Sequence, residues 1–478
     1  MRVEVRQEAP EQVDADLLVL GLFEEEELPQ ALSDAPGASD AKGGYKKLSV
    51  LHPERPGRAL VVGLGKRDEM EPERARVAAA LAAKEAGRLD SGEIVWAVPD
   101  AGEAELVAAA LVEGTVLGEY RFDRFLSKES DDSSSTKIAS LTLLGEESLA
   151  DAAEAARVCA EAQNRARDLQ SLPSNVATPS YLAERAEAIA AAGEALSVEV
   201  LGRDEIAAKG MGGLVAVSQG ADEDPRLIVL RYSGGGSGPT LGLVGKGVTF
   251  DTGGISLKPS AGMQEMKMDM SGAAAVLEAV AAIAELALPL ELIAIVPSTE
   301  NMPSGNAIKP GDVITQYNGK TVEVNNTDAE GRLILADALT YAVELGAERI
   351  VDLATLTGAV LIALGSTYAG LMSNDDALAG QLEQAGQTSG ELVWRLPLHP
   401  EYKELFKGTV ADLSNTASKR KAGTIYAGSF LEEFVGDTPW AHIDIAGTAW
   451  DVGREYTGND ASGFGVRLLV ELARELAG

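Results

Sequence analysis

Short apolar segments with strand-forming residues alternate with alanine-rich helical segments along the chain, and this alternation constrains the fold most. Strands that alternate with helices indicate an α/β domain with a largely parallel sheet. In the first part of the chain, helices are predicted at Glu71–Arg88 and Ala104–Leu117, with a polar loop at Asp131–Ser135. The strands predicted there are Val3–Arg6, Leu17–Leu20, Lys47–Leu51, Ala59–Gly63, Ile94–Val98 and Ala139–Leu144.

The same alternation continues after a long alanine-rich helix predicted at Glu146–Leu169. A chain of 478 residues is too long for one hydrophobic core. We therefore expect two α/β domains, 1–160 and 161–478, with the junction inside this helix. The strands predicted for a central sheet in the second domain are Val198–Leu201, Arg226–Tyr232, Leu241–Val244, Leu290–Val296, Arg349–Leu353 and His442–Ile445. The helices predicted to cover both faces of that sheet are Ser180–Ala192, Glu205–Lys209, Ala273–Glu285, Arg332–Leu345, Tyr426–Phe434 and Ser462–Leu476.

The composition argues against several classes of partner. The formal net charge is −33, from 74 acidic against 41 basic residues. A general nucleic-acid surface needs a basic patch, and an anionic membrane attracts basic segments, so neither partner is expected. The single cysteine, Cys159, allows no intrachain disulfide framework and fits a reducing compartment. With no apolar signal-peptide core at Met1–Arg6 and no run of spanning length, the expectation is a cytoplasmic protein.

Two carboxylates stand two positions apart at Asp328 and Glu330, followed by Gly331, Arg332 and an apolar run that predicts the start of a buried helix. If this segment is extended, residues two apart point the same way, so both carboxylates would face one site. Gly331 would then allow a sharp turn that sets Arg332 beside the carboxylates. The alternative is a solvated loop with an Arg–Asp ion pair.

A second charged cluster lies upstream, where Lys246, Asp251, Lys258 and Asp269 are embedded among glycines and apolar residues. Charges in apolar surroundings are costly unless they are paired or bind a metal. Both clusters follow predicted strands, and ligands of open α/β sheets bind at the carboxyl ends of strands. The carboxylates together offer a hard-oxygen site for two divalent cations. From the residues alone, an ion pair with Asp251 is the preferred interpretation of Lys246.

Other hydrolytic chemistries lack the residues they need. A serine triad requires a histidine base, and the histidines are His52, His399 and His442. His442 is expected at a strand edge in a structural role, and the other two precede prolines in loops. No His-Glu-x-x-His zinc motif exists, and Gly245-Lys246-Gly247 lacks the spacing of a phosphate loop. Cys159, in an alanine-rich helix, is predicted to be a core residue and not a nucleophile.

Three motifs carry a resemblance to a known family. The octapeptide NTDAEGRL at 326–333 resembles the signature of the leucine aminopeptidase (cytosol aminopeptidase) family. VGKG at 244–247, FDTGG at 250–254 and LKP at 257–259 resemble its first metal loop, and DMSGAA at 269–274 resembles the next. The similarity runs from about Asn164 to the C-terminus. It implies a smaller, macro-like N-terminal α/β domain concerned with assembly, and a larger C-terminal α/β catalytic domain with a central mixed sheet flanked by helices.

The resemblance implies a metal-dependent aminopeptidase that removes Leu and other, mostly apolar, N-terminal residues from short peptides through a water activated by two metals. The cations would be Mn²⁺ or Zn²⁺. Asp251 and Glu330 would bridge them, Lys246 and Asp269 would complete the more tightly held site, and Asp328 would complete the more exchangeable one. Lysine as a ligand must be neutral, which nearby divalent charge enforces by lowering its pKa. The resemblance therefore reverses the ion-pair interpretation of Lys246.

The remaining roles also come from the resemblance. Lys258 would stabilise the developing oxyanion, and Arg332 would hold a bicarbonate that serves as general base. The substrate pocket would be lined by Met266, Asn326, Thr355, Leu356 and Gly358, although core packing is an equal interpretation of Met266. The family forms a homohexamer with active sites facing an interior cavity. The alternatives are a dipeptidase such as a Cys-Gly hydrolase, a member with an additional DNA-binding role, and a non-catalytic relative.

Overall fold

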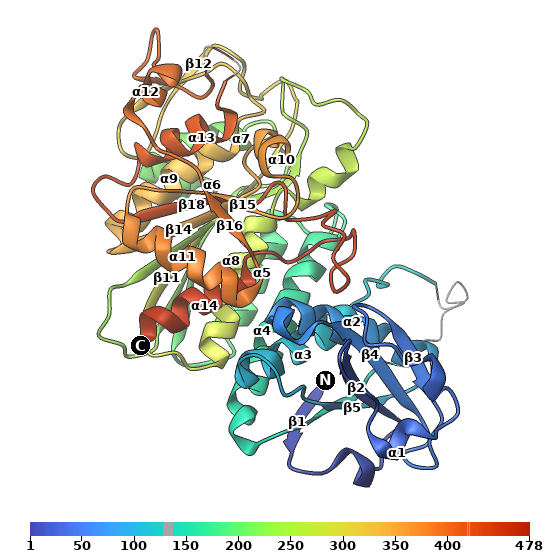
Figure 1. The fold of residues 1–478 in the computed structure, drawn as a ribbon. Coiled ribbons are helices and arrows are strands. Elements are labelled where there is room, and N and C mark those ends of the chain that lie inside the picture. The colour runs from blue at the N-terminus through green and yellow to red at the C-terminus, as the bar shows by residue number, and fades with distance from the viewer. Residues whose placement is uncertain (128–136, 418, 420) are drawn as a thin grey trace. The chain divides into compact units, whose positions relative to one another are not determined.

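The computed structural model describes residues 1–127, 137–417, 419 and 421–478, so the polar loop predicted at Asp131–Ser135 lies outside them. The chain forms two compact units (Figure 1). The first comprises Met1–Asn164 together with Gly453–Gly458, and the second comprises Arg165–Val452 and Asn459–Gly478. Helix α4 (Ala150–Ser171) contains the division, and every candidate site residue lies in the second unit.

The N-terminal unit is built on a six-stranded sheet of order β1-β6-β5-β2-β4-β3, in which only the β3–β4 pair is antiparallel. This agrees with the largely parallel sheet predicted from the alternation. Helices α2 (Pro72–Arg88) and α3 (Ala104–Gly118) pack against each other. The strands are β1 (Arg2–Arg6), β2 (Leu17–Phe23), β3 (Leu48–Leu51), β4 (Ala59–Gly65), β5 (Glu93–Ala97) and β6 (Ser140–Leu144).

The C-terminal unit contains a nine-stranded mixed sheet of order β16-β15-β18-β14-β9-β11-β8-β7, with β10 pairing with β11. Strands β18, β14, β9 and β11 run parallel at its centre, whereas β15 and β8 are antiparallel to them. The bounds are β7 (Leu196–Leu201), β8 (Arg226–Ser233), β9 (Leu241–Gly245), β10 (Gly247–Asp251), β11 (Glu291–Asn301), β14 (Arg349–Ala354), β15 (Ala369–Ser373), β16 (Val393–Arg395) and β18 (Trp440–Asp444).

Helices cover both faces of this sheet, as the sequence predicts. Figure 1 shows α8 (Ser271–Glu285), α11 (Asp376–Ser389) and α14 (Val466–Ala477) on one side of the central strands. Helices α9 (Gly331–Glu344) and α13 (Gly423–Glu432) lie on the other side. Both α8 and α9 pack directly on β9, β11 and β14. The first turn of each helix lies against Lys246, which directly follows β9: the Ala273 N–H donates to the carbonyl oxygen of Lys246 at 2.9 Å, and Gly331 lies beside the lysine side chain. The further helices are α1 (Gln30–Ser33), α5 (Pro179–Ala190), α6 (Arg203–Lys209), α7 (Gly212–Ser218), α10 (Gly358–Leu364) and α12 (Pro400–Lys403).

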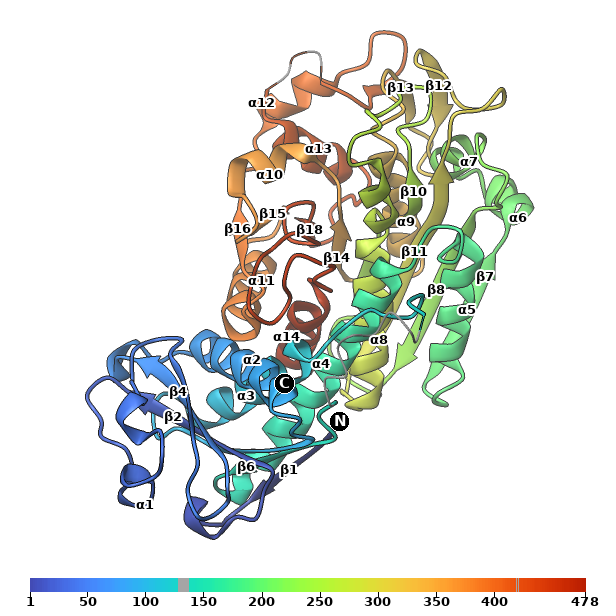
Figure 2. The same cartoon turned by 90° about the vertical axis from the view of Figure 1, so that its right-hand side faces the viewer.

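A three-stranded sheet that the sequence did not predict leads into one of the acidic clusters. It consists of β12 (Asp312–Thr315), β13 (Thr321–Val324) and β17 (Leu413–Ser414). In Figure 2 the hairpin of β12 and β13 lies at the top of the view, beyond β10 and β11. Strand β13 ends at Val324, immediately before the segment that carries Asp328 and Glu330.

The prediction that His442 lies at a strand edge is wrong. His442 is a central residue of β18, which is paired on both sides by β14 and β15, and the side chain is fully buried. The alternating pattern around His442 does not reveal how many strands flank it, because β15 has only five residues and no clear alternation.

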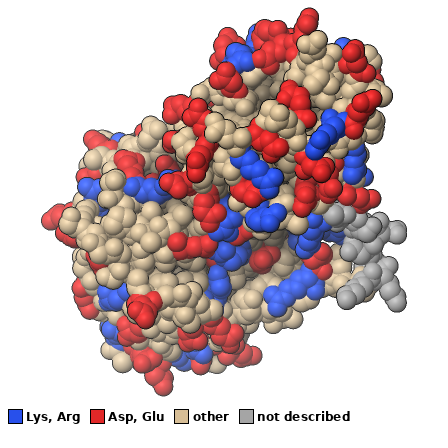
Figure 3. Space-filling view, turned by 90° about the horizontal axis from the view of Figure 1, so that it is seen from below, with Lys and Arg blue, Asp and Glu red and all other residues tan. Residues whose placement is uncertain are grey.

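Acidic and basic side chains are interspersed on the face of the protein shown in Figure 3. None of the helices among the described residues combines the length and the apolar character needed to span a bilayer.

Candidate active site

Lys246 stands at a break between two consecutive strands, β9 and β10, which both run parallel to β11. Its backbone N–H donates to the carbonyl oxygen of Leu353 in β14, at 3.0 Å. Its side chain is only 3% exposed. A lysine buried to this extent needs several partners, since an unpaired charge in the protein interior is costly.

Four carboxylates converge around this lysine from three places in the chain. Asp251 ends β10, Asp269 directly precedes α8, and Asp328 and Glu330 directly precede α9. Ligand atoms of Asp251, Asp328 and Glu330 all lie within 4.8 Å of one another, close enough to share one metal ion. The structure therefore brings together the two charged clusters of the sequence, although Asp251 and Asp328 are 77 positions apart.

The segment around Asp328 and Glu330 is not extended, so the condition under which a strand alternation would align the two carboxylates is not met. Thr327 and Asp328 form a turn, and Glu330 already has helical backbone angles, φ −73° and ψ −37°. The amide oxygen of Asn326 accepts a hydrogen bond from the Asp328 N–H at 3.0 Å, which stabilises this turn. The carboxylates meet because a turn and the first residues of a helix redirect them, and not because of a strand period.

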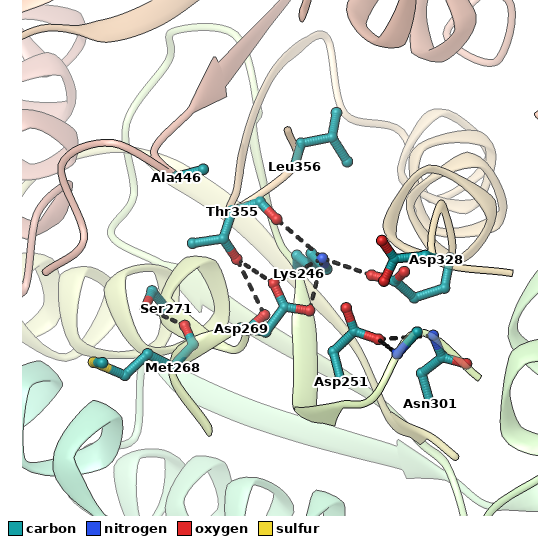
Figure 4. Close-up of polar contacts among 12 residues, drawn as sticks. Lys246, Asp251, Met268, Asp269, Ser271, Asn301, Asp328, Thr355, Leu356 and Ala446 are labelled. Atoms are coloured by element: carbon teal, nitrogen blue, oxygen red, sulfur yellow. Dashed lines mark hydrogen bonds and ion pairs between the residues drawn. The ribbon is translucent and has the colours of Figure 1, made fainter. Parts of the chain in front are cut away.

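The side chain of Lys246 joins Asp269 to Glu330, and Figure 4 shows its contacts with Asp269 and Thr355. Its Nζ lies 2.8 Å from Asp269 Oδ2 and 2.7 Å from Glu330 Oε1, and it donates to the carbonyl oxygen of Thr355 at 3.0 Å. The ion pair with Asp251 that the residues alone suggested is absent, because Asp251 pairs with Lys258 instead. Burial by itself lowers the pKa of Lys246, but the carboxylates of Asp269 and Glu330 outweigh burial and raise the pKa above its ordinary value.

Lys258 reaches the same cluster from a loop that folds back after β10. Its Nζ lies 2.8 Å from Asp251 Oδ2 and also forms an ion pair with Asp328. Gly253 makes this return possible, since it has φ +84°, and a Cβ there would stand 2.7 Å from Asp328 Oδ1. The neighbouring carboxylates raise the pKa of Lys258 although burial opposes them, so this lysine is a fixed cation.

Burial disfavours the ionised form of the carboxylates in this cluster, and a bound cation would compensate their negative charge. Burial raises the pKa of Asp251 to about 6, and it also raises the pKa of Asp328. For Glu330, burial works in the same direction but is outweighed by Lys246 and Lys258, so its pKa is lowered and it stays ionised. Glu330 Oε2 is buried and has no hydrogen-bond partner among the described residues, which leaves it available as a metal ligand.

Gly331 is required for close approach and not for the sharp turn that the sequence suggested. It is the first residue of α9, and its φ is not positive. A Cβ at this position would lie 2.8 Å from Cε and 2.9 Å from Nζ of Lys246. The glycine between Glu330 and Arg332 therefore provides the space that the lysine occupies.

Arg332 is buried beside the cluster, and the described residues contain no carboxylate that forms an ion pair with it. Its Nη1 donates to the carbonyl oxygen of Asn415 at 2.7 Å, and its guanidinium lies 5.0 Å from the ring centre of Tyr426. Its Nε is buried without a partner among the described residues. The solvated loop with an Arg–Asp ion pair is thus the wrong interpretation, and an arginine with a free buried donor is suited to a small anion.

The loop after β14 carries three of the predicted pocket residues. Thr355 Oγ1 donates to Asp269 Oδ1 at 2.7 Å, which places this loop directly on the acidic cluster. Leu356 is half-buried, and Gly358 begins α10 with no atom within 4 Å of the position of a Cβ. Asn326 lies in the turn beside Asp328, and Met266 is half-buried in the 3-10 helix that precedes Asp269. Thr355 and Asn326 therefore contact residues of the cluster directly, whereas Leu356, Gly358 and Met266 lie on segments that adjoin it in the sequence.

Several buried polar residues of the site carry no sequence signal that singled them out. Asn301 donates to Asp251 Oδ1 at 2.8 Å. Asn415 accepts from the N–H of Asn325 at 2.9 Å and donates to the carbonyl oxygen of Asn326 at 2.7 Å. Asp444 accepts from Thr357 Oγ1 at 2.6 Å and from the N–H of Leu356 at 3.1 Å. These three side chains hold the loops on which the charged residues stand.

Comparisons with known proteins agree with this geometry. The catalytic-domain model of the cytosol aminopeptidase family matches residues 164–470, and the N-terminal-domain model of the same family matches residues 14–129. A probable cytosol aminopeptidase of Roseiflexus castenholzii is 46% identical over 99% of both chains. One of Chlorobium luteolum is 48% identical over 98% of both chains.

Solved structures are similar over almost the full length. A mutant of tomato leucine aminopeptidase matches with a TM-score of 0.89 and 34% identity, covering 99% of this chain and 96% of that one. The bottromycin maturation enzyme BotP in complex with Mn matches with a TM-score of 0.88 and 35% identity, covering 97% of this chain and 100% of the other. Neither the alternative of a dipeptidase nor that of a DNA-binding role is favoured by these relatives.

Proposed function

Because this chain belongs to the cytosol aminopeptidase family and is a metal-dependent aminopeptidase, we propose which of its residues carry the reaction. The observation that supports the assignment is the convergence of Asp251, Asp269, Asp328 and Glu330 around Lys246. Lys246 follows β9, Asp251 ends β10, and the other three carboxylates stand just before α8 and α9, at the edge of the sheet where α/β proteins bind ligands.

The proposed site holds two divalent cations, Mn²⁺ or Zn²⁺. Asp251 and Glu330 would serve both cations, Lys246 and Asp269 would complete the ligands of one, and Asp328 would complete those of the other. The buried, unpartnered Glu330 Oε2 and the proximity of three carboxylates support this assignment. When bound, such a pair of cations activates a water for attack and polarises the scissile carbonyl.

Lys246 acts in this site as a neutral amine. Its contacts with Asp269 and Glu330 hold it as an ammonium while those carboxylates are not neutralised by cations. Once divalent charge neutralises the carboxylates, burial remains, and burial lowers the pKa of a lysine. The same side chain can therefore compensate the negative charge of the empty cluster and coordinate a cation in the loaded one.

Lys258 and Arg332 supply the positive charge that the reaction itself needs. Lys258 remains an ammonium at the edge of the cluster, with a side chain 22% exposed, and stabilises the oxyanion that develops on the scissile carbonyl. Arg332 would hold a bicarbonate through its buried, unpartnered Nε, and this anion would supply a general base for the reaction. His442 is fully buried within β18, and its Nδ1 lies 2.6 Å from Asp352 Oδ1.

Short peptides are the proposed substrates, with Leu and other apolar residues at the N-terminus. Met266, Asn326, Thr355, Leu356 and Gly358 line the pocket for the first side chain. A pocket of this kind distinguishes substrates that differ by one methylene by only ~1–3 kcal/mol, so specificity is broad. We further propose a cytoplasmic homohexamer, in keeping with the cytosolic naming of the relatives.

The test is metal removal followed by resupply. Chelator-treated protein should not hydrolyse leucyl-p-nitroanilide, and either Mn²⁺ or Zn²⁺ should restore activity. Asp251→Ala and Glu330→Ala should lose bound metal and activity together. The matched control is Asp376→Ala, since the Asp376 side chain is 92% exposed and, among the residues that the structure describes, forms an ion pair only with Arg395. Full metal content in both site variants would contradict the assignment, and faster hydrolysis of Cys-Gly than of leucyl peptides would favour a dipeptidase.

A further inference from the structure

Asn301 is a buried neutral residue in direct contact with the acidic cluster. It ends β11 and is 2% exposed. Its Nδ2 donates to Asp251 Oδ1 at 2.8 Å and to the carbonyl oxygen of Thr327 at 3.0 Å (Figure 4 shows it beside Asp251). One amide thus joins the strand that carries Asp251 to the turn that carries Asp328.

The orientation of this amide is determined by its surroundings. Both contacts of Nδ2 are to acceptors, so a rotated amide would set its oxygen against the carboxylate of Asp251 and the carbonyl of Thr327. The backbone of Asn301 is held separately, because its carbonyl oxygen accepts from the Thr252 N–H at 3.1 Å and from Thr252 Oγ1 at 2.7 Å. A change of the side chain alone leaves these backbone bonds available.

The amide also determines which oxygen of Asp251 is free. Asp251 Oδ1 accepts from Asn301 Nδ2 and from the Gly253 N–H, both at 2.8 Å. A carboxylate oxygen offers about two lone-pair directions, so these two donors fill Oδ1. The other oxygen, Oδ2, faces the cluster, where Lys258 Nζ lies at 2.8 Å.

We propose that Asn301 is a positioning residue that confines Asp251 to cation binding through Oδ2 alone and ties it to the turn that carries Asp328. This inference deepens the proposed function and depends on it. Without the amide donor, Asp251 Oδ1 would retain one free lone pair, and the carboxylate could rotate away from the geometry that two cations require. The carbonyl of Thr327 would also lose its partner, which loosens the residue directly before Asp328. Partners that orient metal ligands typically contribute 10–100-fold to metal affinity.

The experiment measures Mn²⁺ affinity of the full chain by isothermal titration calorimetry after chelation. Asn301→Leu keeps the branched shape of the side chain without donors but is larger, and Asn301→Ala removes the side chain, so that one variant remains informative if the other does not fold. We expect both to weaken Mn²⁺ binding by ~10–100-fold. Hydrolysis of leucyl-p-nitroanilide should fall at limiting Mn²⁺ and recover at excess Mn²⁺, with KM nearly unchanged.

A matched control separates this role from ordinary core packing. Thr299→Val removes a buried hydroxyl from the same strand, one that donates to the carbonyl oxygen of Glu300 at 3.0 Å, without touching Asp251. It should lower the melting temperature of the metal-free protein, because it removes a buried hydrogen bond, while leaving Mn²⁺ affinity unchanged. An Mn²⁺ affinity of the Asn301 variants within twofold of wild type overturns the inference. Failure of the wild-type protein to bind Mn²⁺ would instead overturn the proposed function.

Discussion

Replacing Gly331 by alanine tests whether the space around Lys246 is as restricted as the structure indicates. The added Cβ would lie 2.8 Å from Cε and 2.9 Å from Nζ of Lys246, so the lysine must move by about 0.6 Å to reach the 3.4 Å at which ordinary contact begins. The far end of a lysine usually moves at little cost. Here it is held by Glu330 Oε1 at 2.7 Å and by the carbonyl oxygen of Thr355 at 3.0 Å, so the movement disturbs the metal site.

Two opposing effects determine the magnitude. Alanine is more favourable than glycine in a helix by ~0.5–1 kcal/mol, whereas overpacking a well-filled interior costs ~1–3 kcal/mol. At Gly331 the cost of overpacking exceeds the gain in helix propensity, so the free energy of unfolding should fall by about 1–2 kcal/mol. Helix propensity affects folding alone, so only the strain on Lys246 enters metal binding. Because ~1.4 kcal/mol corresponds to a tenfold change in an equilibrium constant, strain of that size on a ligand residue should lower the Mn²⁺ affinity of Gly331→Ala about tenfold, as measured by calorimetry on the chelated protein.

The control for this substitution is Gly380→Ala. Gly380 lies within α11 on the surface, and no atom stands within 4 Å of the position of its Cβ. Only the helix-propensity effect remains there, so this variant should be stabilised by ~0.5–1 kcal/mol in thermal unfolding without metal, and its Mn²⁺ affinity should not change. Wild-type Mn²⁺ affinity and activity in Gly331→Ala would refute the reasoning, since they would show that the Lys246 side chain can accommodate an added methyl group without disturbing the site.

Three further predictions follow from other contacts. Lys258→Ala should keep bound Mn²⁺ but lower kcat ~100-fold or more, since it removes a cation placed for the oxyanion; unchanged turnover would exclude that role. Asp444→Ala should raise KM more than it changes metal content, because the loop at Leu356 and Thr357 loses its anchor. Burial raises the pKa of Asp251 to about 6, so a proton competes with the cation below that pH. Mn²⁺ affinity should therefore fall as pH decreases from 7 to 5, and a pH-independent affinity would contradict this.

The sequence predicts the central part of the fold because its strands are rich in apolar residues with high strand propensity. Strands β9, β11 and β14 and helices α8 and α9 were all expected near their observed positions. Two neighbouring strands were missed: β16 has three residues, too few for a pattern to distinguish it from a loop, and β15 has the sequence AGLMS, in which alanine, glycine and serine give little strand signal. The hairpin of β12 and β13 is similarly short, and its role becomes visible only through the acidic turn that follows it.

The charged residues of the site could be predicted because a charge within an apolar segment is costly unless it is paired or binds a metal. Lys246, Asp251 and Asp269 were identified on that ground, and the structure brings them together with Asp328 and Glu330. Neutral residues such as Asn415 give no such signal, since an asparagine in a loop is ordinary. Asn415 nevertheless holds the acidic turn at Asn325 and Asn326 and accepts from Arg332, through contacts that span about 90 positions.

The contact between Asn301 and Asp251 depends on the register in which two strands pair, and the sequence does not reveal that register. Strands β10 and β11 pair in parallel, but their register shifts between Val248 and Phe250. A shift of one residue reverses which face of a strand each side chain occupies. With the shift, Asp251 stands opposite Asn301; without it, Phe250 would occupy that place and the carboxylate would leave the cluster. Bulges of this kind re-aim side chains beside active sites, and nothing in the local sequence predicts this one.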